Sequence, residues 1–397
     1  MNALTMPSNW QRVRLGDIAE IIGGGTPSTQ VASFWNGSIN WFTPTEIGIT
    51  KYVHKSQRTI TLLGLKKSSA KLLPVGTILL TSRASIGDCA ILKVVATTNQ
   101  GFQSLIPLEK INNEFLYYLM LTLKNKLLKL ASGSTFLEVS PNKIKNLLIP
   151  LPPLNEQIAI ANILSDVDRY LYSLDALILK KESVKKALSF ELLSQRKRLK
   201  GFNQAWQKVR LGDICEFGNG GAYETLIVEN GDFKLISLNS IDIDGNLKNT
   251  MKRVNFYDNS LKQDDIVMVL SDVAHGDFLG LCAVIPSNDY VLNQRMGRLR
   301  IRNDCINILF LRLYINANQK YFKMQGQGSS QLNLSKKAIE DFEILLPPLN
   351  EQIAIANILS GLDSEIISLK NKKRQFENIK KALNHDLMSA KIRVLEK

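Results

Sequence analysis

The three histidines are the first residues to test for acid–base chemistry, and they do not support it. His54, His275 and His385 are far apart in the chain, and none has a cysteine or serine spaced for nucleophilic catalysis. The sequence also lacks an Asp/Asn-Pro-Pro-Tyr methyltransferase motif and a nuclease-type carboxylate–lysine set. We therefore expect no catalytic residue in this chain.

Cofactor and metal motifs are missing as well. The Gly-rich stretch 23–28 has no Gly-x-x-x-x-Gly-Lys-Ser/Thr pattern, so it indicates a turn and not a phosphate cradle. The four cysteines lack Cys-x-x-Cys spacing and predict reduced thiols, with neither a zinc site nor a disulfide framework. We expect no metal and no bound cofactor. The cysteines are Cys89, Cys215, Cys282 and Cys305.

Residues that could read nucleic-acid bases occur on loops that follow apolar strands. Arginine can pair with guanine, and asparagine or glutamine with adenine, in a DNA major groove. Arg83 follows the predicted strand 75–81, and Asn99-Gln100 follows the predicted strand 90–95. In the second half, the loop 271–276, which contains His275, follows the strand predicted at 265–270, and Asn293-Gln294-Arg295 forms the second loop. Any one of these residues alone is better explained as a turn residue or a satisfied surface group. The DNA-contact hypothesis therefore rests on their combination on loops of a basic protein.

One stretch occurs twice and organises everything else. Residues 151–165 and 346–360 share the same fifteen letters, beginning Leu-Pro-Pro-Leu-Asn-Glu-Gln, at an offset of 195. The stretch that begins at Trp10 also returns at Trp206, with Leu-Gly-Asp-Ile in both copies. Amphipathic helices are predicted at 113–130 and 309–321, one before each copy of the fifteen-residue stretch. Two tandem halves therefore account for the chain.

The repeated stretch predicts a long helix in each half. Asn155 is a plausible N-cap, and apolar residues then alternate by four and three with no proline for about 45 residues. A helix with one apolar seam needs a partner, and an antiparallel pairing of the two copies is favoured over a parallel one. An ordinary long core helix in each half is the alternative. The predicted seam consists of Leu164, Val167, Leu171, Leu174, Ile178, Leu188, Leu359, Leu362, Ile366, Leu369 and Leu383.

Composition favours a binding protein with a polyanionic partner. The 397 residues carry a formal net charge of +14, which suits nucleic acid. No apolar run is long enough to cross a bilayer and no secretory signal is visible, so we expect a cytoplasmic protein.

These features together resemble the specificity subunit of a type I restriction–modification system. The motifs that carry the resemblance are the two Leu-Pro-Pro-Leu-Asn-Glu-Gln helices, Leu-Gly-Asp-Ile after Trp10 and after Trp206, Gly-Gly-Thr-Pro at 24–27 and the aromatic stretch 35–41. The second half replaces Gly-Gly-Thr-Pro with Gly-Gly-Ala-Tyr at 220–223, which suggests a different recognition subtype. The resemblance covers essentially the full length.

The resemblance implies an α+β fold in which two mixed α/β target recognition domains are joined by two long helices, pairing as an antiparallel coiled coil with a pseudo-twofold internal repeat. The expected parts are a first recognition domain at 1–150, a central helix at 151–200, a second recognition domain at 201–345 and a C-terminal helix at 346–397. Each domain would read half of a split double-stranded DNA target, and the helices would set the spacer. The partners implied are two methyltransferase subunits, which bind S-adenosylmethionine, and restriction subunits.

On this interpretation the chain recognises DNA without being an enzyme. The predicted DNA contacts are Arg83, Asn99, Gln100, Ser134, His275, Asn293, Gln294, Arg295 and Ser329. The predicted partner-docking residues are Asn155, Glu156, Gln157, Asn350, Glu351 and Gln352. The alternatives are a coiled-coil scaffold that binds protein, a fused enzyme, and a recognition module of another restriction or modification type.

Overall fold

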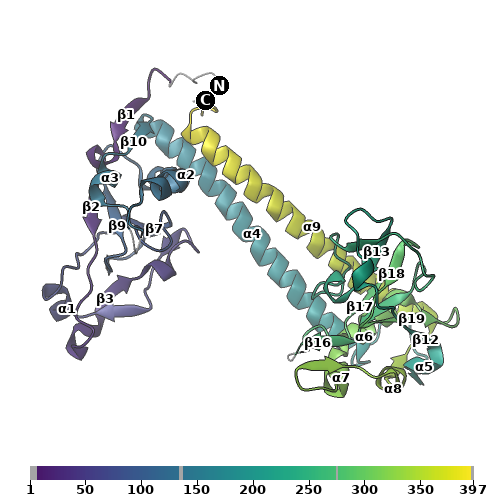
Figure 1. The fold of residues 1–397 in the computed structure, drawn as a ribbon. Helices are drawn as coiled ribbons and strands as arrows, with labels where there is room; N and C mark the ends of the chain where they lie inside the picture. Colours follow the sequence, from purple (N-terminus) through teal and green to yellow (C-terminus); the bar gives the residue numbers. More distant parts are fainter. Residues whose placement is uncertain (1–6, 134–136, 274–275, 395–397) are drawn as a thin grey trace. The chain divides into compact units, whose positions relative to one another are not determined.

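The computed structural model describes residues 7–133, 137–273 and 276–394. The chain divides into two units, one formed by Met1–Asp175 with Asn371–Lys397 and the other by Ala176–Lys370. Each unit contains one α/β domain and part of each of two long helices, α4 (Leu154–Leu193) and α9 (Leu349–Met388) (Figure 1). The helices belong to the repeated stretch, so the same sequence feature supplies both units with their frame.

The domain of unit 1 is built on two sheets packed face to face. The larger sheet has the strand order β2-β9-β6-β7-β4, antiparallel except for the β4–β7 pair, and the smaller has the order β5-β3-β8. Leu79, Leu92 and Phe42 are among the buried residues between them. The strands are β2 (Ala19–Gly23), β9 (Gln103–Pro107), β6 (Ile78–Leu80), β7 (Cys89–Leu92), β4 (Tyr52–Val53), β5 (Arg58–Ile60), β3 (Trp35–Phe42) and β8 (Ala96–Thr98).

Helix α2 (Asn113–Leu130) covers the other face of the larger sheet, at the bounds that the sequence predicts. Its side chains Phe115, Leu116 and Leu119 share one core with the sheet and with the first turns of α4. Strand β1 (Gln11–Arg14) pairs antiparallel with β10 (Leu148–Leu151), which leads into α4. The short helices of this domain are α1 (Leu62–Lys66) and α3 (Pro141–Lys145).

The domain of unit 2 repeats this plan with one addition. Its two main sheets have the orders β12-β19-β15-β17 and β14-β13-β18, and β11 pairs with β21 ahead of α9. The addition is a two-stranded sheet of β16 with β20. The strands are β11 (Gln207–Arg210), β12 (Cys215–Asn219), β13 (Phe233–Ile236), β14 (Lys252–Val254), β15 (Ile266–Val269), β16 (Ser271–Val273), β17 (Cys282–Val284), β18 (Tyr290–Leu292), β19 (Met296–Ile301), β20 (Gln331–Asn333) and β21 (Glu343–Leu346).

The helix predicted at 309–321 is in fact two helices. Helix α6 (Ile308–Ala317) ends at Asn318, whose backbone leaves the helical conformation, and α7 (Gln319–Gln325) begins immediately after it. The Asn318 side chain donates back to the carbonyl of Tyr314, a local bond that competes with the helical backbone pattern. The remaining short helices are α5 (Leu211–Ile214) and α8 (Lys336–Glu340).

The antiparallel pairing of the long helices is confirmed by contacts within each unit. In unit 1, Asp168 of α4 pairs with Lys380 of α9, and Asp175 pairs with Lys373 at 2.6 Å. In unit 2, Lys185 pairs with Asp363. The Asp168–Lys380 and Asp363–Lys185 pairs are the same contact at the repeat offset of 195. Such charge pairs beside an apolar seam help to set helix orientation and register.

The predicted seam residues all lie at buried or half-buried positions. Leu164, Leu174, Ile178, Leu359 and Ile366 are buried, and the other predicted seam residues, Val167, Leu171, Leu188, Leu362, Leu369 and Leu383, are half-buried. Among the described helices none is long and apolar enough to cross a membrane.

The helix ends differ from the prediction. Each helix has 40 residues, about 60 Å at 1.5 Å per residue, and not about 45. Helix α4 starts at Leu154 directly after the proline pair, so Asn155 lies inside the first turn and is not the N-cap. It stops at Leu193 because Gln195 takes a left-handed conformation, with φ of 61°. Ala390, with φ of 58°, does the same after α9.

Candidate nucleic-acid interface

The Gly-rich loop of unit 1 is a close crossing of two backbone segments. The amide of Gly25 donates to the carbonyl of Thr98 at 2.8 Å, and a Cβ on Gly24 would lie 1.9 Å from the Asn99 carbonyl oxygen. Trp41 donates its indole N–H to the Gly25 carbonyl at 2.8 Å. The glycines are therefore required by packing, in agreement with the prediction of a turn.

This crossing positions two of the predicted DNA contacts. Asn99 is half-buried, and its Oδ1 accepts from the amide of Gly101 at 2.8 Å, which closes a tight turn. Gln100 at the head of the turn is exposed and accepts from the hydroxyl of Thr26. The sequence separates Thr26 and Gln100, whereas the crossing makes them neighbours.

Unit 2 has the same backbone crossing, although its sequence at 220–223 differs from that of 24–27 in unit 1. The amide of Gly221 donates to the Leu292 carbonyl at 3.0 Å, and a Cβ on Gly220 would lie 2.0 Å from the Asn293 carbonyl oxygen. Gln294 donates to Glu224 at 2.5 Å, where unit 1 has the Thr26–Gln100 contact. The frame of the crossing is common to both units, and the exposed groups on it differ.

Asn293 lies in a loop after a strand, as predicted, but its side chain is buried. Its side chain is 1% exposed, accepts from the amide of Tyr223 at 3.0 Å and donates to Glu224 at 3.0 Å. It fastens the segment after Gly221 to the end of β18. A DNA contact from this buried side chain would require the segment to open.

Three loops of unit 1 meet at one edge of the domain. The amide of Ser82 donates to the Gly101 carbonyl at 2.8 Å, and the amide of Val139 donates to the Ser82 carbonyl at 3.1 Å. Arg83 lies at this junction, 43% exposed, in an ion pair with Glu138 at 2.8 Å. The structure thus brings Arg83 together with the Asn99–Gln100 turn.

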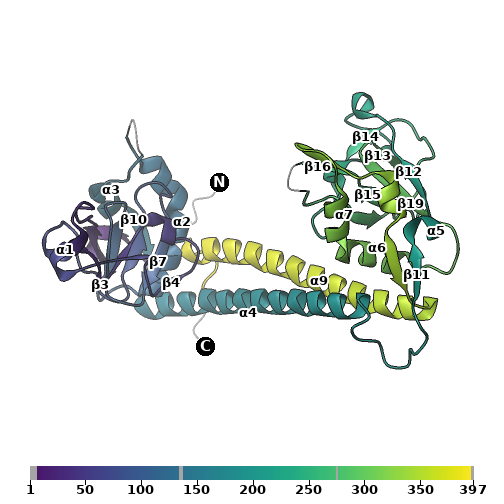
Figure 2. The ribbon, with the colours of Figure 1, turned by 90° about the horizontal axis from the view of Figure 1, so that it is seen from below.

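The corresponding loops of unit 2 also converge. The amide of Leu270 donates to the Arg295 carbonyl at 2.9 Å, and the amide of Leu334 donates to the Leu270 carbonyl at 2.8 Å. Arg295 and Ser329 are both exposed. Figure 2 shows β16, which continues from Leu270, on the side of this domain away from α9. Two predicted contacts, Ser134 and His275, lie outside the described residues.

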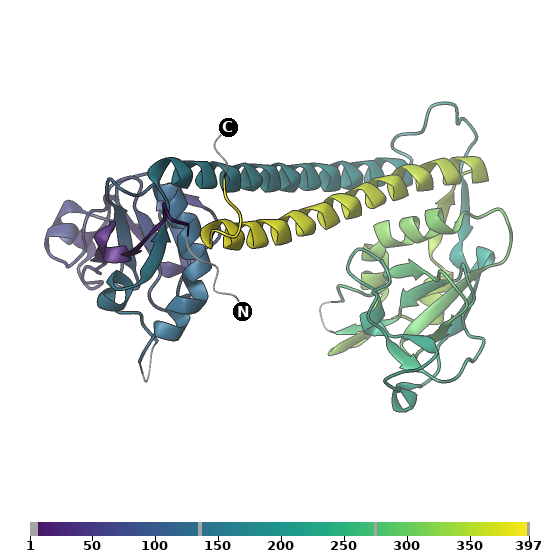
Figure 3. The ribbon, with the colours of Figure 1, turned by 90° about the horizontal axis from the view of Figure 1, so that it is seen from above.

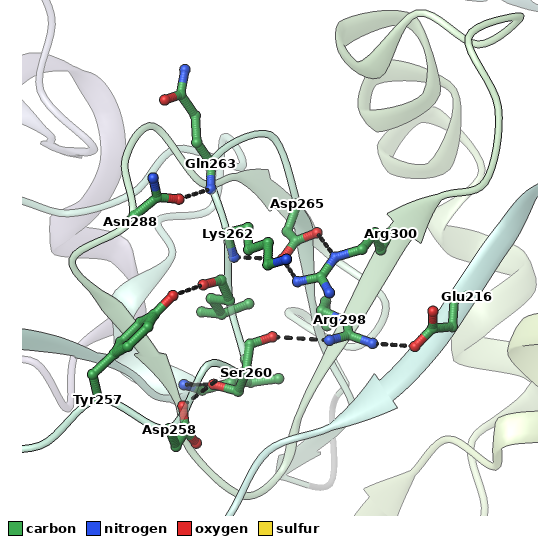
Figure 4. Close-up of polar contacts among 12 residues, drawn as sticks. Glu216, Tyr257, Asp258, Ser260, Lys262, Gln263, Asp265, Asn288, Arg298 and Arg300 are labelled. Carbon is green, nitrogen blue, oxygen red and sulfur yellow. Dashed lines mark hydrogen bonds and ion pairs between the residues drawn. The ribbon is translucent and has the colours of Figure 1, made fainter.

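Two arginines of β19 are not free for phosphate contacts (Figure 4). Arg300 forms a two-bond ion pair with Asp265, at 2.8 and 2.7 Å, which raises the pKa of the guanidinium. Arg298 donates to the carbonyl of Ser260 at 3.1 Å and to Glu216 at 2.5 Å. These bonds hold the segment 257–265 against the sheet. Arg298 and Arg300 are two residues apart on β19 and so share one face of the strand, a local sequence pattern from which their common role could have been inferred.

Four of the predicted docking residues are internal. Gln157 accepts from the amide of Asn112 at 2.9 Å and donates to the carbonyls of Lys110 and Pro152 at 3.1 and 2.9 Å. Gln352 makes the corresponding three bonds in unit 2. Glu156 and Glu351 are buried as well, at 8% and 0% exposure. These side chains join the start of each long helix to its recognition domain, because Asn112 is the N-cap of α2.

Other residues of each repeated stretch are exposed to solvent, unlike the buried glutamate and glutamine side chains. Leu154 and Ile158 are 46% and 42% exposed, and their repeat partners Leu349 and Ile353 are 38% and 40% exposed. Asn155 and Asn350 are exposed beside them. We call these two sets, Leu154, Asn155 and Ile158 and Leu349, Asn350 and Ile353, the repeat faces.

A polar cluster that the sequence did not reveal ties the unit 1 domain to its helices. Lys51 donates to Tyr118 at 2.9 Å and to Ser165 of α4 at 2.8 Å, and forms an ion pair with Glu114. Tyr118 donates to Asp168 at 2.5 Å. Burial lowers the pKa of Lys51 and raises that of Tyr118.

The described residues offer no group of three or more His, Cys, Asp or Glu side chains that could hold a metal ion. Burial raises the pKa of the Cys89 and Cys215 thiols to about 12, which keeps both protonated at neutral pH. These buried thiols are therefore poor nucleophiles.

Comparison with known families agrees with this architecture. The model of the type I restriction modification DNA specificity domain matches residues 7–181 and again residues 203–378. The chain therefore belongs to this family and contains two copies of its domain.

Individual relatives agree with this assignment. The type I restriction enzyme MjaVIII specificity subunit of Methanocaldococcus jannaschii is 28% identical over 99% of this chain and 95% of its own length. The MjaIX specificity subunit of the same organism is 41% identical, but the match covers 41% of this chain and 39% of the relative. The match to the EcoR124I/EcoR124II specificity subunit of Escherichia coli likewise spans only 40% of that relative.

Two solved structures share the fold. The type I restriction–modification S subunit from M. genitalium has a TM-score of 0.63 at 19% identity, covering 98% of both chains. The HsdS subunit from Thermoanaerobacter tengcongensis has a TM-score of 0.54 at 18% identity, covering 98% of this chain and 99% of that one.

Proposed function

We propose that this chain is the DNA-recognition subunit of a type I restriction–modification complex, with each domain reading one half of a bipartite duplex target. The observation that carries the proposal is the convergence of three loops in each domain, two of which follow strands in both units. Arg83 and Gln100 in unit 1, and Gln294 and Arg295 in unit 2, are exposed or half-exposed there. These residue types recognise guanine and adenine edges.

The formal net charge of +14 supports a polyanionic partner. The loops differ between units while the frame is the same, which suits two different half-sites. In this proposal the long helices set the unread spacer, because a helix has a fixed rise per residue.

The repeat faces support docking of two copies of one partner. Each face presents two aliphatic side chains and an asparagine to solvent, in identical sequence. Exposed aliphatic residues arranged this way are typical of interaction surfaces. We assign each face to one methyltransferase subunit, which would bind S-adenosylmethionine and methylate adenine. Restriction subunits would join through that core, and this chain would contribute recognition without catalysis.

The proposal is tested by mapping adenine methylation in cells that carry this gene with its neighbouring methyltransferase gene. A deletion of this gene alone provides the comparison. We expect one bipartite motif with a fixed gap to lose its methylation in the deletion strain. If the deletion strain shows the same methylation as the strain that expresses both proteins, the proposal is contradicted and a scaffold role is favoured.

The docking assignment has its own test. Ile158→Asp together with Ile353→Asp should abolish co-purification with the methyltransferase, while the unfolding temperature of the chain alone stays the same because both side chains are exposed. Leu179→Asp, at an exposed position of α4 outside the repeat faces, is the matched control. Co-purification that survives both aspartates would remove the repeat faces from the proposal.

A further inference from the structure

Each long helix begins with a buried glutamate that binds an arginine from the segment after the other long helix. In unit 1, Glu156 of α4 accepts from Arg393, with Nε at 3.0 Å from Oε1 and an Nη at 3.4 Å from Oε2. In unit 2, Glu351 of α9 accepts from Arg198, at 3.1 and 2.6 Å. Both arginines follow the left-handed turns that end the helices, and Figure 3 shows the segment after α9, in yellow, crossing to α4.

The same glutamates also bind the recognition domains. Trp10 donates its indole N–H to Glu156 at 3.1 Å, and Trp206 donates to Glu351 at 3.1 Å. We call Glu156 with Trp10 and Arg393 latch 1, and Glu351 with Trp206 and Arg198 latch 2. Each tryptophan stands directly before the strand that pairs with the one leading into the helix, β1 with β10 and β11 with β21.

The apolar core already holds each domain against its helix, so the contribution of the latches is to fix the orientation of the domain on that helix. Apolar burial depends on area and tolerates small rotations. A guanidinium fork on a carboxylate has a narrow geometry, and bonds to a buried charge strengthen it further. Base contacts need placement to within roughly 0.5 Å, which a directional clamp at the domain's root helps to provide.

We infer that Arg393 and Arg198 are positioning residues for DNA reading, each fixing how one recognition domain is presented on its helices. Latch 1 serves only the first domain and latch 2 only the second, although Arg393 lies at the other end of the chain from the domain that it serves. The inference rests on the proposed function, because it concerns the discrimination of half-sites.

The experiment is methylation mapping with Arg393→Ala and, separately, Arg198→Ala, in cells that supply the methyltransferase. For each variant, methylation is scored at genomic sites with one mismatched base in either half of the motif. Each variant should lose discrimination at one half-site by about tenfold, the scale of one misplaced base contact, and keep it at the other. The two variants should affect different halves.

Controls separate positioning from general destabilisation. Lys391→Ala and Arg196→Ala remove a positive charge two residues before each latch arginine and should leave both half-sites unchanged. Arg393→Lys and Arg198→Lys keep the charge without the fork and should give intermediate relaxation. If an alanine variant does not accumulate in the cell, the lysine variant at the same position tests the inference in its place.

Loss at both half-sites together from each single variant, or full discrimination in both alanine variants, would overturn the inference. A wild-type chain without any bipartite motif would instead count against the proposed function itself.

Discussion

The two recognition domains meet their helices in different ways. In unit 1, the cluster of Lys51, Glu114, Tyr118 and Asp168 fills the interface with hydrogen bonds, and Asn384 of α9 donates to the Tyr118 carbonyl at 3.1 Å. In unit 2, the helices and the domain instead line a cavity of about 860 Å³. Its walls include Lys185, Phe190 and Ile367 on the helices and Asp244, Tyr314 and Asn318 on the domain.

The difference shows which contacts the repeat requires. The glutamine and glutamate bonds at the helix starts, the apolar seam and the glycine crossings occur in both units. Among the described residues, the polar cluster occurs in unit 1 and has no counterpart in unit 2. A shared frame at the root of each domain thus permits divergence further along the same interface.

The largest predicted effect tests the shared frame. Leu164→Ala and Leu359→Ala each remove a fully buried side chain at the same repeat position. Each should lower the free energy of unfolding of its unit by about 3–4 kcal/mol through lost burial and a cavity. Hydrogen exchange resolved by unit is the measurement. Buried Leu→Ala substitutions in general cost about 2.7–5.0 kcal/mol. If the losses in unfolding free energy caused by Leu164→Ala and Leu359→Ala differ by more than about 2 kcal/mol, the two units do not have equivalent frames.

The second prediction tests the polar cluster of unit 1. Lys51→Ala should destabilise unit 1 by about 2 kcal/mol, because Glu114 and Tyr118 lose a charged donor in a half-buried site. The control is Lys370→Ala, which removes a lysine paired with Glu182 in unit 2 at 48% side-chain exposure. That control should cost less than about 1 kcal/mol. Chemical denaturation monitored by hydrogen exchange separates the two, and equal costs would argue against a special interface in unit 1.

The third prediction concerns alkaline pH. Burial raises the pKa of Tyr52, Tyr117 and Tyr118 above the usual 10.0 of a phenol. The unfolded chain then loses these protons first as the pH rises above 10, so the stability they contribute is complete below pH 10 and declines above it. Tyrosinate absorbance, compared between wild type and Tyr118→Phe, measures this. Ionisation of these tyrosines at an ordinary pKa without unfolding would contradict the prediction.

The smallest effect tests the turns after the helices. Gln195 and Ala390 both have positive φ, a conformation that glycine adopts at lower cost. Gln195→Gly and Ala390→Gly should each stabilise the chain, by less than about 1 kcal/mol, in thermal unfolding. Ser194→Gly and Ser389→Gly, at the positions just before, should not stabilise it. Destabilisation by the first pair would mean that the left-handed turns are not maintained.

Much of the architecture could be predicted because its signals are local or repeated. The heptad seam and the fifteen identical residues predict paired helices, and α2 has the predicted bounds. The helix ends were missed because Gln195 gives no local sign of a left-handed turn, and the division between α6 and α7 depends on one asparagine.

The site was harder to predict because its bonds connect distant residues. Asn293 and Gln294 are neighbours in one predicted loop, yet only Asn293 of the two is buried, by partners 69 and 70 positions away. The partner of Glu156 is Arg393, at a separation of 237. No spacing rule within one half of the chain could reveal that glutamates predicted to dock a partner are bound internally. The exposed loops were found because polar residues after strands are a local pattern.

The segment after α9 has a genetic consequence. Latch 1 is completed by Arg393, which is encoded far downstream of Trp10 and of the recognition loops of unit 1. A nonsense or frameshift mutation after codon 389 would therefore leave both recognition domains translated in full but would deprive the first of its arginine. Reading errors confined to one half of a DNA motif could thus arise from a lesion far downstream of the codons for the domain that reads it.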